Sequence, residues 1–254
     1  VGILFWATAE PLYQYQAPPE SLEIAPQSKA ASVFAMSTLL HHWTLLPYSM
    51  YAVPAVLFAL AFYNLGQPFR LSSCLYPLLG RYSRGGVGVL VDTVCLFALV
   101  AGMAASLGAG ILTLGGGLNS LFGIESGPVV WVAIGVVVVA SFIVSAVSGL
   151  QKGVRVLSDL NTKVFFALML LIALVGPSGD RIALTLAGVA DYFVNLIPRG
   201  FLWAFDDKDP WLLAWTLFYW ANWMAWAPVT ALFLGRISKG YTVRQMMLFT
   251  LVLP

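Results

Sequence analysis

The stretch Val129–Leu150 reads VVWVAIGVVVVASFIVSAVSGL and contains no charged residue. A helix that crosses the roughly 30 Å hydrocarbon core of a bilayer needs about 20 mostly apolar residues and satisfies its own backbone hydrogen bonds. The whole chain has the same character, because 60% of its 254 residues are hydrophobic and 9% are charged, with a mean hydropathy of +0.86. Soluble domains carry about a quarter charged residues. We therefore predict an all-α, polytopic membrane protein.

Further membrane spans are predicted by the same rule on both sides of this stretch. They are Val1–Ala9, which is partial, Leu39–Tyr63, Gly88–Leu114, Val164–Val175, Trp211–Leu234 and a segment that begins near Val243. Because the chain begins with Val1 rather than Met and stops at Pro254 within an apolar run, we expect a fragment of a longer protein. No charged segment followed by a small-residue cleavage site precedes the first span, so we do not expect a signal peptide there.

One segment between spans differs from the others. Arg181–Leu196 carries Asp191 together with an apolar set at helical spacing, which comprises Ile182, Leu186, Val189 and Phe193. This pattern is typical of an amphipathic helix that lies at the membrane interface.

The charged residues indicate the orientation of the chain. If alternate loops lie on opposite sides, one side has only Asp92 and Asp159 as acidic residues. The basic residues on that side are Arg70, Arg81, Arg84, Lys152, Arg155, Lys163, Arg236, Lys239 and Arg244. This side should face the cytoplasm, which predicts a multi-pass protein of the cytoplasmic (inner) membrane. The net charge of +2 is small and scattered, so we expect no nucleic-acid partner.

The segment Trp211–Pro228 reads WLLAWTLFYWANWMAWAP and contains five tryptophans. Trp220, Trp223 and Trp226 fall within about 120° of arc on a helix, so one face can present several indole rings. Indole faces can replace part of the lost hydration of a buried trimethylammonium group, at roughly 0.5 to 2 kcal/mol per ring. The alternative is ordinary aromatic packing, which the pattern alone does not exclude.

A second aromatic set lies in the segment His41–Tyr51, which reads HHWTLLPYSMY. Trp43, Tyr48 and Tyr51 fall within about 140° of arc, so they could complete a cage with the tryptophan-rich span. The two adjacent histidines that begin this segment point about 100° apart on a helix and cannot share one metal ion. A proton-linked role and a hydrogen-bonded interfacial role remain open for them.

Three other features carry expectations about backbone and charge. The first segment, VGILFWATAEPL, places Gly2 near bilayer depth, where an unwound stretch could expose carbonyls to a substrate or an ion. Small residues recur every four positions in the span from Gly88, which indicates close helix packing, and Gly115–Gly117 should end that helix. Asp92 is either a functional acid or a paired structural one. Cys74 and Cys95 have no disulfide or zinc spacing and are interpreted as packing residues.

The segment WTLFYWANWMAWAP, from Trp215 to Pro228, resembles the signature of the betaine/choline/carnitine transporter family, which lies on that family's eighth span. Supporting similarity covers the whole chain, in VGILFWATAEPL, HHWTLLPYSMY, GLQKGVRVLSDLN and FLGRISKGYTVRQ. The resemblance implies a LeuT-type helical bundle with two inverted repeats and a substrate site at the membrane midplane. On this basis residues 1–175 would form most of the first repeat, 176–208 an external loop with the amphipathic helix, and 209–254 the start of the second repeat.

The resemblance also implies roles for individual residues. Carried over by motif position, the ammonium cage would comprise Trp43, Tyr48, Tyr51 and Trp223, and Trp226 would bind on its cytoplasmic side. The pathway or its gates would be lined by Phe5, Phe218 and Trp220. The amphipathic helix would mediate contacts in a homotrimer. The substrate would be a small cationic or zwitterionic solute such as choline, glycine betaine, carnitine or a sulfonium analogue, carried by a symporter that serves osmoprotection.

The sequence departs from the family pattern at three places. Tyr48 stands where the family commonly has Trp, and Asn222 replaces a signature Trp. Leu99–Ala105 reads LVAGMAA and lacks the hydroxyl residues that help to hold one sodium ion in sodium-coupled members. Coupling remains open between one sodium ion at the first segment, which resembles the family's glycine-rich third span, a proton, and solute exchange, and no other cofactor is expected.

Two different classes of protein remain as alternatives. One is a LeuT-type carrier of another amine or amino acid, whose substrate carboxylate would need helix N-termini and exposed backbone donors. The other is a membrane sensor that does not transport. An enzyme is not expected, because the sequence has no paired acid and base, no HExxH motif and no Ser/His/Asp set on plausible faces.

Overall fold

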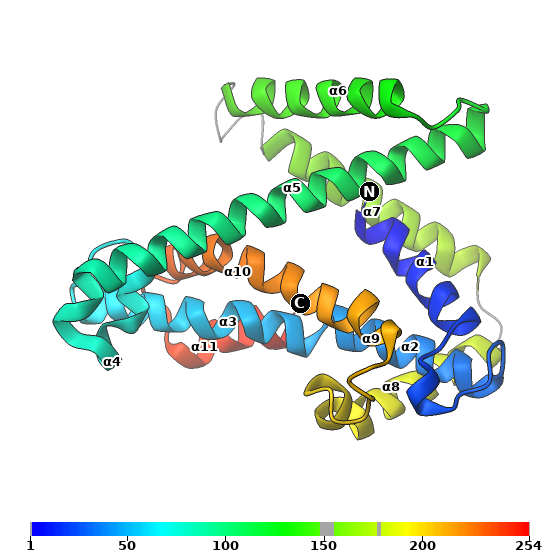
Figure 1. The fold of residues 1–254 in the computed structure, drawn as a ribbon, viewed down its shortest axis with the longest axis horizontal. Helices are drawn as coiled ribbons and strands as arrows, with labels where there is room; N and C mark the ends of the chain where they lie inside the picture. Colours follow the sequence, from blue (N-terminus) through cyan, green and yellow to red (C-terminus); the bar gives the residue numbers. More distant parts are fainter. Residues whose placement is uncertain (1, 148–154, 177–178, 254) are drawn as a thin grey trace. The chain divides into compact units, whose positions relative to one another are not determined.

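A computed structural model describes residues 2–147, 155–176 and 179–253 of the chain (Figure 1). Every regular element in these ranges is helical. In chain order the elements are α1 (Gly2–Gln16), η1 (Glu20–Leu22), α2 (Lys29–Trp43), α3 (Leu45–Ala59), η2 (Leu60–Asn64), η3 (Leu71–Leu75), α4 (Tyr76–Leu79), η4 (Gly80–Arg84), α5 (Gly86–Phe122), α6 (Pro128–Val147), α7 (Arg155–Val175), α8 (Gly179–Gly200), α9 (Pro210–Leu212), η6 (Leu213–Leu217), α10 (Phe218–Ile237), α11 (Val243–Met247) and η7 (Leu248–Val252). The prediction of an all-α protein is confirmed.

Within the described ranges, three helical stretches are long and apolar enough to cross a membrane. They are Lys29–Asn64, Gly86–Phe122 and Pro128–Ser145. The predicted spans Val164–Val175 and Trp211–Leu234 are also helical, in α7 and in α9 to α10, but they are not among these three. The first half of α7 contains Arg155, Asp159 and Lys163, and the tyrosine and tryptophans of α10 carry polar groups that make this helix less apolar overall. Val1, Lys152 and residues 148–150, which end the predicted span Val129–Leu150, lie outside the described part of the chain.

The chain divides into two compact units. Residues 105–183 belong to the first, which contains the second half of α5 together with α6, α7 and the start of α8. Residues 2–104 and 184–253 belong to the second, which contains α1 to α4, the first half of α5, most of α8, and α9 to α11. The aromatic residues singled out above all lie in the second unit.

Local chemistry explains where the helices of the second unit begin and end. The Ser28 hydroxyl accepts a hydrogen bond from the Ala31 N–H at 3.0 Å and caps α2. At Thr44 the backbone leaves the helical region, with φ −121° and ψ −125°, which separates α2 from α3. The predicted span Leu39–Tyr63 is therefore broken one residue after Trp43, and its helix begins earlier, at Lys29. Helical spacing counted through Thr44 therefore does not predict how residues on its two sides are oriented relative to one another.

The three consecutive glycines of α5 do not end that helix, so this prediction was wrong. α5 continues through Gly115–Gly117 to Phe122 and ends at Gly123, whose φ is +68°. A glycine inside a helix costs about 1 kcal/mol relative to alanine, which neighbouring hydrogen bonds can offset. Gly123 differs because it adopts the left-handed conformation that terminates helices, and its N–H donates to the Asn119 carbonyl at 2.9 Å.

The core of the second unit forms where α3 and α10 pack side by side, as Figure 1 shows. Ala55, Ala231 and Met246 are buried there, from α3, α10 and α11. A Cβ atom placed on Gly235 would lie 2.4 Å from a ring carbon of Phe58, so only glycine fits at this crossing. Small residues thus bring α3 and α10 close together, which positions their aromatic side chains.

The small residues of α5 pack less uniformly than their spacing predicts. A Cβ atom on Gly102 would lie 2.7 Å from the Cβ of Ala225, so α5 and α10 approach closely at this point. A Cβ atom on Gly110 would meet nothing within 4 Å. Asp92, also on α5, accepts hydrogen bonds from the Ser72 N–H at 2.8 Å and the Ser72 hydroxyl at 3.0 Å. These contacts favour the structural interpretation of Asp92.

The predicted amphipathic helix is present as α8. Its apolar residues Ile182, Leu186 and Phe193 are each more than half exposed, whereas Tyr192 on its other face is buried. Arg199 of α8 forms an ion pair with Asp191 at 2.5 Å. The face of α8 that carries Ile182, Leu186 and Phe193 is therefore exposed, while the face that carries Tyr192 packs against the rest of the second unit.

Candidate functional site

Trp223 of α10 is the centre of a group of aromatic rings. Its ring centroid lies 5.7 Å from that of Trp43, 6.0 Å from that of Tyr48 and 5.2 Å from that of Tyr51. We call Trp43, Tyr48, Tyr51 and Trp223 the aromatic cluster. The structure therefore brings together the four residues that the sequence proposed as a cage, from three helices and from both sides of the break at Thr44.

Backbone geometry and one hydrogen bond orient this cluster. Trp43 is the last residue of α2, and Tyr48 and Tyr51 lie in the first two turns of α3. The indole N–H of Trp223 donates to the His42 carbonyl at 3.0 Å, at the end of α2 where carbonyls lack helical partners. The ring of Trp223 is therefore fixed against the break between α2 and α3.

A buried network of polar groups adjoins the aromatic cluster at Trp43. The Glu10 carboxylate, from α1, is fully buried. One of its oxygens, Oε1, lies 2.5 Å from Nδ1 of His42, which is also fully buried. The other, Oε2, accepts hydrogen bonds from the Trp43 indole N–H at 2.8 Å and the Tyr219 hydroxyl at 2.6 Å. We call Glu10, His42 and Tyr219, together with Thr216, the polar network.

Thr216 completes the polar network from the start of the tryptophan-rich span. Its hydroxyl lies 3.0 Å from Nε2 of His42. Thr216 belongs to η6, a π-helical turn, and Tyr219 follows in the first turn of α10. π-Helical turns occur frequently at functional sites. The ring of Tyr219 stacks on that of His42, with centroids 4.4 Å apart and planes 18° from parallel.

The two adjacent histidines have separate surroundings, as their helical spacing predicted. The ring nitrogens of His41 lie 2.9 Å from the Ser37 carbonyl and 3.2 Å from the Asn195 carbonyl. Its ring packs edge-on against Tyr192 of α8. Among the described residues, no three His, Cys, Asp or Glu side chains are grouped to hold a metal ion. His42 therefore contacts a carboxylate, while His41 contacts only neutral groups in these bonds.

The other predicted site residues lie around these two groups. Trp220 is buried, donates from its indole N–H to the Gly200 carbonyl at 3.3 Å, and packs edge-on against His42. Trp226 is partly buried one turn beyond Trp223 on α10. Phe5 and Phe218 are 42% and 54% exposed, so their rings face outward from the buried network.

The idea that Gly2 marks an unwound stretch has no support in the described residues. α1 runs without a break from Gly2 to Gln16 and includes Pro11. Glu10 lies inside this helix rather than at its end.

One turn after Glu10, the buried Gln14 accepts a hydrogen bond from the Trp211 indole N–H at 2.6 Å. The amide nitrogen of Gln14 has no hydrogen-bond partner among the described residues.

Sequence reasoning missed Glu10, although a signal for it was present. A carboxylate inside an otherwise apolar segment is expensive to bury and is usually functional or paired. Its partners His42 and Tyr219 lie 32 and 209 positions away in the chain, so no local pattern links them to it. The residue was therefore identifiable as unusual, but its contacts were not.

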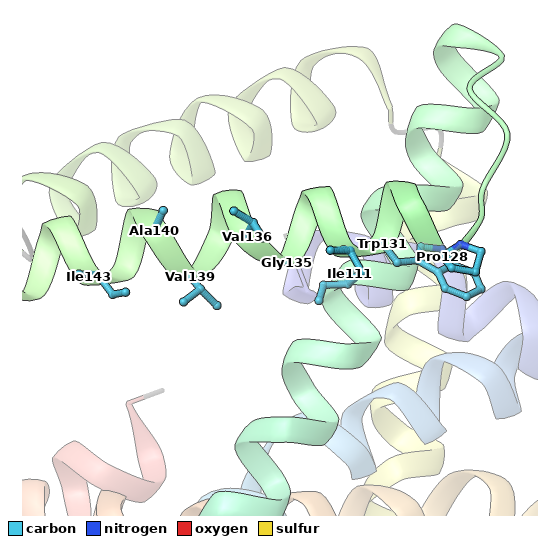
Figure 2. A pocket seen from close by; sticks show the side chains of 9 residues that line it. Ile111, Pro128, Trp131, Gly135, Val136, Val139, Ala140 and Ile143 are labelled. Atoms are coloured by element: carbon cyan, nitrogen blue, oxygen red, sulfur yellow. The ribbon is translucent and has the colours of Figure 1, made fainter.

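A separate hollow lies in the first unit, along one face of α6 (Figure 2). It has a volume of about 710 Å³ and is bordered by Ile111 of α5 and by residues of α6. The α6 residues are Pro128, Trp131, Val132, Gly135, Val136, Val139, Ala140 and Ile143. The indole N–H of Trp131 donates to the Ser126 hydroxyl at 2.9 Å. Because this lining offers no charged group to orient a solute, the hollow is a weaker candidate than the aromatic cluster.

Helices of membrane-spanning length, a helix break and a partly buried aromatic cluster define the chain as part of a multi-pass membrane protein of the helical transporter class. The sequence profile described as BCCT, betaine/carnitine/choline family transporter, matches residues 1–254. The chain belongs to this family, which confirms the resemblance noted in its sequence. The family is one of transporters rather than enzymes.

Named relatives agree with this assignment. The chain is 34% identical over 255 residues to Glycine betaine transporter 1 of Vibrio parahaemolyticus, and covers 48% of that protein. It is 36% identical over 257 residues to the High-affinity choline transport protein of Escherichia coli, and covers 37% of it. It is 34% identical over 256 residues to the Glycine betaine transporter OpuD of Bacillus subtilis, and covers 50% of it. All of this chain is covered in each comparison, so it spans half or less of the length of these relatives.

Proposed function

We propose that the protein carries a small quaternary-ammonium or related solute across the cytoplasmic membrane by alternating access. Choline, glycine betaine, carnitine and sulfonium analogues have the required chemistry. The observation that carries the proposal is the convergence of Trp43, Tyr48 and Tyr51 on Trp223, within 6.0 Å between ring centroids. The names of the relatives, which include glycine betaine and choline transporters, support it.

The aromatic cluster suits a cation that has no N–H group to donate. A trimethylammonium group loses its hydration in a buried site, and no carbonyl or carboxylate can replace that hydration through a hydrogen bond. Ring faces attract the charge at roughly 0.5 to 2 kcal/mol each. The ring of Trp223 contacts the other three rings, so the solute binds on an open ring face or moves the rings apart as it enters. Trp226 extends this surface along α10, and Trp220, Phe218 and Phe5 line or gate the path.

Coupling to an ion is part of the proposal. The protein acts as a symporter with Na⁺ or H⁺ as its coupling ion and serves osmoprotection. The segment that would supply one sodium site, Leu99–Ala105, lacks hydroxyl residues, which leaves the first segment, Val1–Ala9, as the site of a sodium ion or a titratable group as the site of a proton. The exposed apolar face of α8 supports a homotrimer as the assembly, because an apolar face at a membrane interface is stabilised by contact with another chain.

Uptake by the full-length protein tests the proposal. Radiolabelled choline, glycine betaine and carnitine are offered to proteoliposomes with and without Na⁺, at an imposed pH gradient or none. We expect concentrative uptake of at least one of these solutes, driven by one of the two ion gradients. If none of them is taken up while an unrelated amino acid is, the carrier of another amine or amino acid replaces this proposal.

A further inference from the structure

The polar network contains a carboxylate and an imidazole that the proposed cage does not use. Glu10 and His42 are both fully buried and lie 2.5 Å apart, on α1 and α2. One hydrogen bond links this pair to the aromatic cluster, because Oε2 of Glu10 accepts a hydrogen bond from the indole N–H of Trp43 at 2.8 Å. A charge on this pair therefore acts directly on any solute that contacts the ring of Trp43.

The hydrogen bonds define which protons the pair can hold. The indole of Trp43 can only donate, and the Tyr219 hydroxyl donates to the same oxygen, so Oε2 is an acceptor. The short contact between Oε1 and Nδ1 of His42 holds one proton. The remaining nitrogen, Nε2, faces the Thr216 hydroxyl at 3.0 Å, and a hydroxyl can either donate or accept.

The pair consequently has two states, and both satisfy the hydrogen bonds of Glu10 and His42 with Trp43, Tyr219 and Thr216. In one state Glu10 is a carboxylate, His42 is neutral, and Nε2 accepts from the Thr216 hydroxyl. In the other state a proton taken from solution sits on Nε2, which then donates to the same hydroxyl. The net charge of the pair is −1 in the first state and zero in the second. Adding the proton requires only rotation of one hydroxyl group.

Neighbouring titratable groups do not fix this charge by direct contact. Among the described residues, the Glu10 carboxylate forms hydrogen bonds with His42, Trp43 and Tyr219, and none of these side chains has a permanent positive charge. On α2, His41 faces α8, where Arg199 is paired with Asp191. Before α9, the carboxylate of Asp209 accepts from backbone N–H groups. A buried carboxylate without a cation is costly, so a proton or a solute cation stabilises the site.

We infer that Glu10 and His42 form a one-proton site whose negative state is the counter-charge for a cationic solute, so that this proton and the cation oppose each other's binding. The inference rests on the proposed function, because it needs the solute's ammonium group at the aromatic cluster. A cation on the ring face of Trp43 lies within roughly 12 Å of the Glu10 carboxylate. At an effective dielectric constant of about 20, removing a unit charge at that distance changes the affinity about tenfold.

Choline and glycine betaine form a matched pair of probes for this inference. Both carry a trimethylammonium group, but choline has a net charge of +1 whereas glycine betaine is a zwitterion near neutral pH. The charge of the polar network attracts the ammonium group of both, and it also repels the carboxylate of glycine betaine. The pH dependence of binding should therefore be large for choline and small for glycine betaine.

The test measures the dissociation constants of choline and glycine betaine for the full-length protein in detergent, at fixed Na⁺, from pH 5 to pH 8. We expect choline to bind at least about tenfold more tightly at pH 8 than at pH 5, with a change of less than about threefold for glycine betaine. Choline binding near the midpoint should release protons, which calorimetry in buffers of different ionisation enthalpy detects. Equal pH profiles for the two solutes would overturn the inference.

Three variants separate charge from structure. Glu10→Gln keeps an acceptor for Trp43 and Tyr219 but removes the charge, so choline should bind at pH 8 as weakly as it binds to the wild type at pH 5. Glycine betaine binding by the same variant reports that the site is intact. His42→Gln keeps the carboxylate and should shift the pH dependence for choline to more acidic values. His41→Gln, on the same helix but turned to α8, should leave the profile unchanged.

The outcomes distinguish this inference from the proposed function. If the wild type binds neither solute at any pH, the proposed function fails and the inference fails with it. If both solutes bind but Glu10→Gln retains the choline pH profile of the wild type, the inference alone is wrong. If Glu10→Gln does not fold, the His42→Gln profile decides, and an unchanged midpoint in that variant overturns the proton site.

Discussion

Replacement of Trp223 by leucine is the most direct perturbation of the aromatic cluster. The substitution removes the ring that contacts Trp43, Tyr48 and Tyr51, and it deletes the hydrogen bond to the His42 carbonyl. Leucine keeps an apolar side chain on α10, so insertion into the membrane should not change. The perturbation therefore acts on ring faces and on their orientation rather than on the topology.

The expected loss of affinity follows from the number of rings affected. One cation–π contact is worth roughly 0.5 to 2 kcal/mol, so losing the Trp223 face alone raises the dissociation constant by about 2-fold to 30-fold. The three rings that rest on Trp223 also lose their common support. We expect a total loss of about 1 kcal/mol or more, which corresponds to a fivefold or larger rise.

Equilibrium binding of radiolabelled choline and glycine betaine to the purified full-length protein measures this effect. Trp223→Phe is a matched variant, because it keeps a ring face but loses the indole N–H, and it should bind more tightly than Trp223→Leu. Trp203→Leu is the control outside the cluster, since Trp203 is 73% exposed and stacks on Phe201. If folded Trp223→Leu protein binds both solutes as tightly as the wild type, the cage assignment is refuted.

The remaining predictions concern a helix cap and a helix contact. Burial raises the pKa of the Asp209 carboxyl, but hydrogen bonds from Ser21 and from the α9 backbone lower it more, so its pKa lies below the usual value. The stabilisation is therefore present above the unfolded-state pKa, about 3.9, and is lost as the pH falls through the lower folded-state pKa. Asp209→Asn should lower the stability by about 1 kcal/mol at pH 7, and thermal unfolding should show this difference shrinking in acid; an equal difference at pH 3 and pH 7 would contradict it. Gly102→Ala should destabilise the protein by about 1 to 3 kcal/mol, because its Cβ would meet that of Ala225, whereas Gly108→Ala on the same helix meets nothing within 4 Å and should be neutral or slightly stabilising. Equal unfolding temperatures for the two variants would show that α5 and α10 do not approach as closely as described.

Several elements show how far local sequence patterns extend. Apolar length was sufficient to place helices α5 and α6, because a chain in lipid must satisfy its backbone internally. The same reasoning failed at Gly115–Gly117, where it took glycine as a stop signal. The helix ends instead at Gly123, because the left-handed conformation rather than the residue type terminates a helix.

The candidate site shows a sharper division. Helical spacing placed Trp43, Tyr48 and Tyr51 on related faces, and the composition of the tryptophan-rich span singled out Trp223. Spacing could not show that a break at Thr44 lies between two of these residues, nor that Glu10 and His42 would meet. Such contacts depend on the packing of separate helices, which periodicity within one helix does not describe.

The sequence by itself determined that this protein lies in a lipid bilayer, that its backbone is helical, and which family it belongs to. Each of these properties is encoded in local composition or in a contiguous motif. Only the tertiary structure decided that rings from α2, α3 and α10 converge, and that a carboxylate of α1 lies against a histidine of α2. The physical reason is that each segment in lipid must satisfy its backbone hydrogen bonds internally, so its own composition is enough to make it helical. Which side chains of different helices touch depends instead on where the helices approach closely, at small residues such as Gly235.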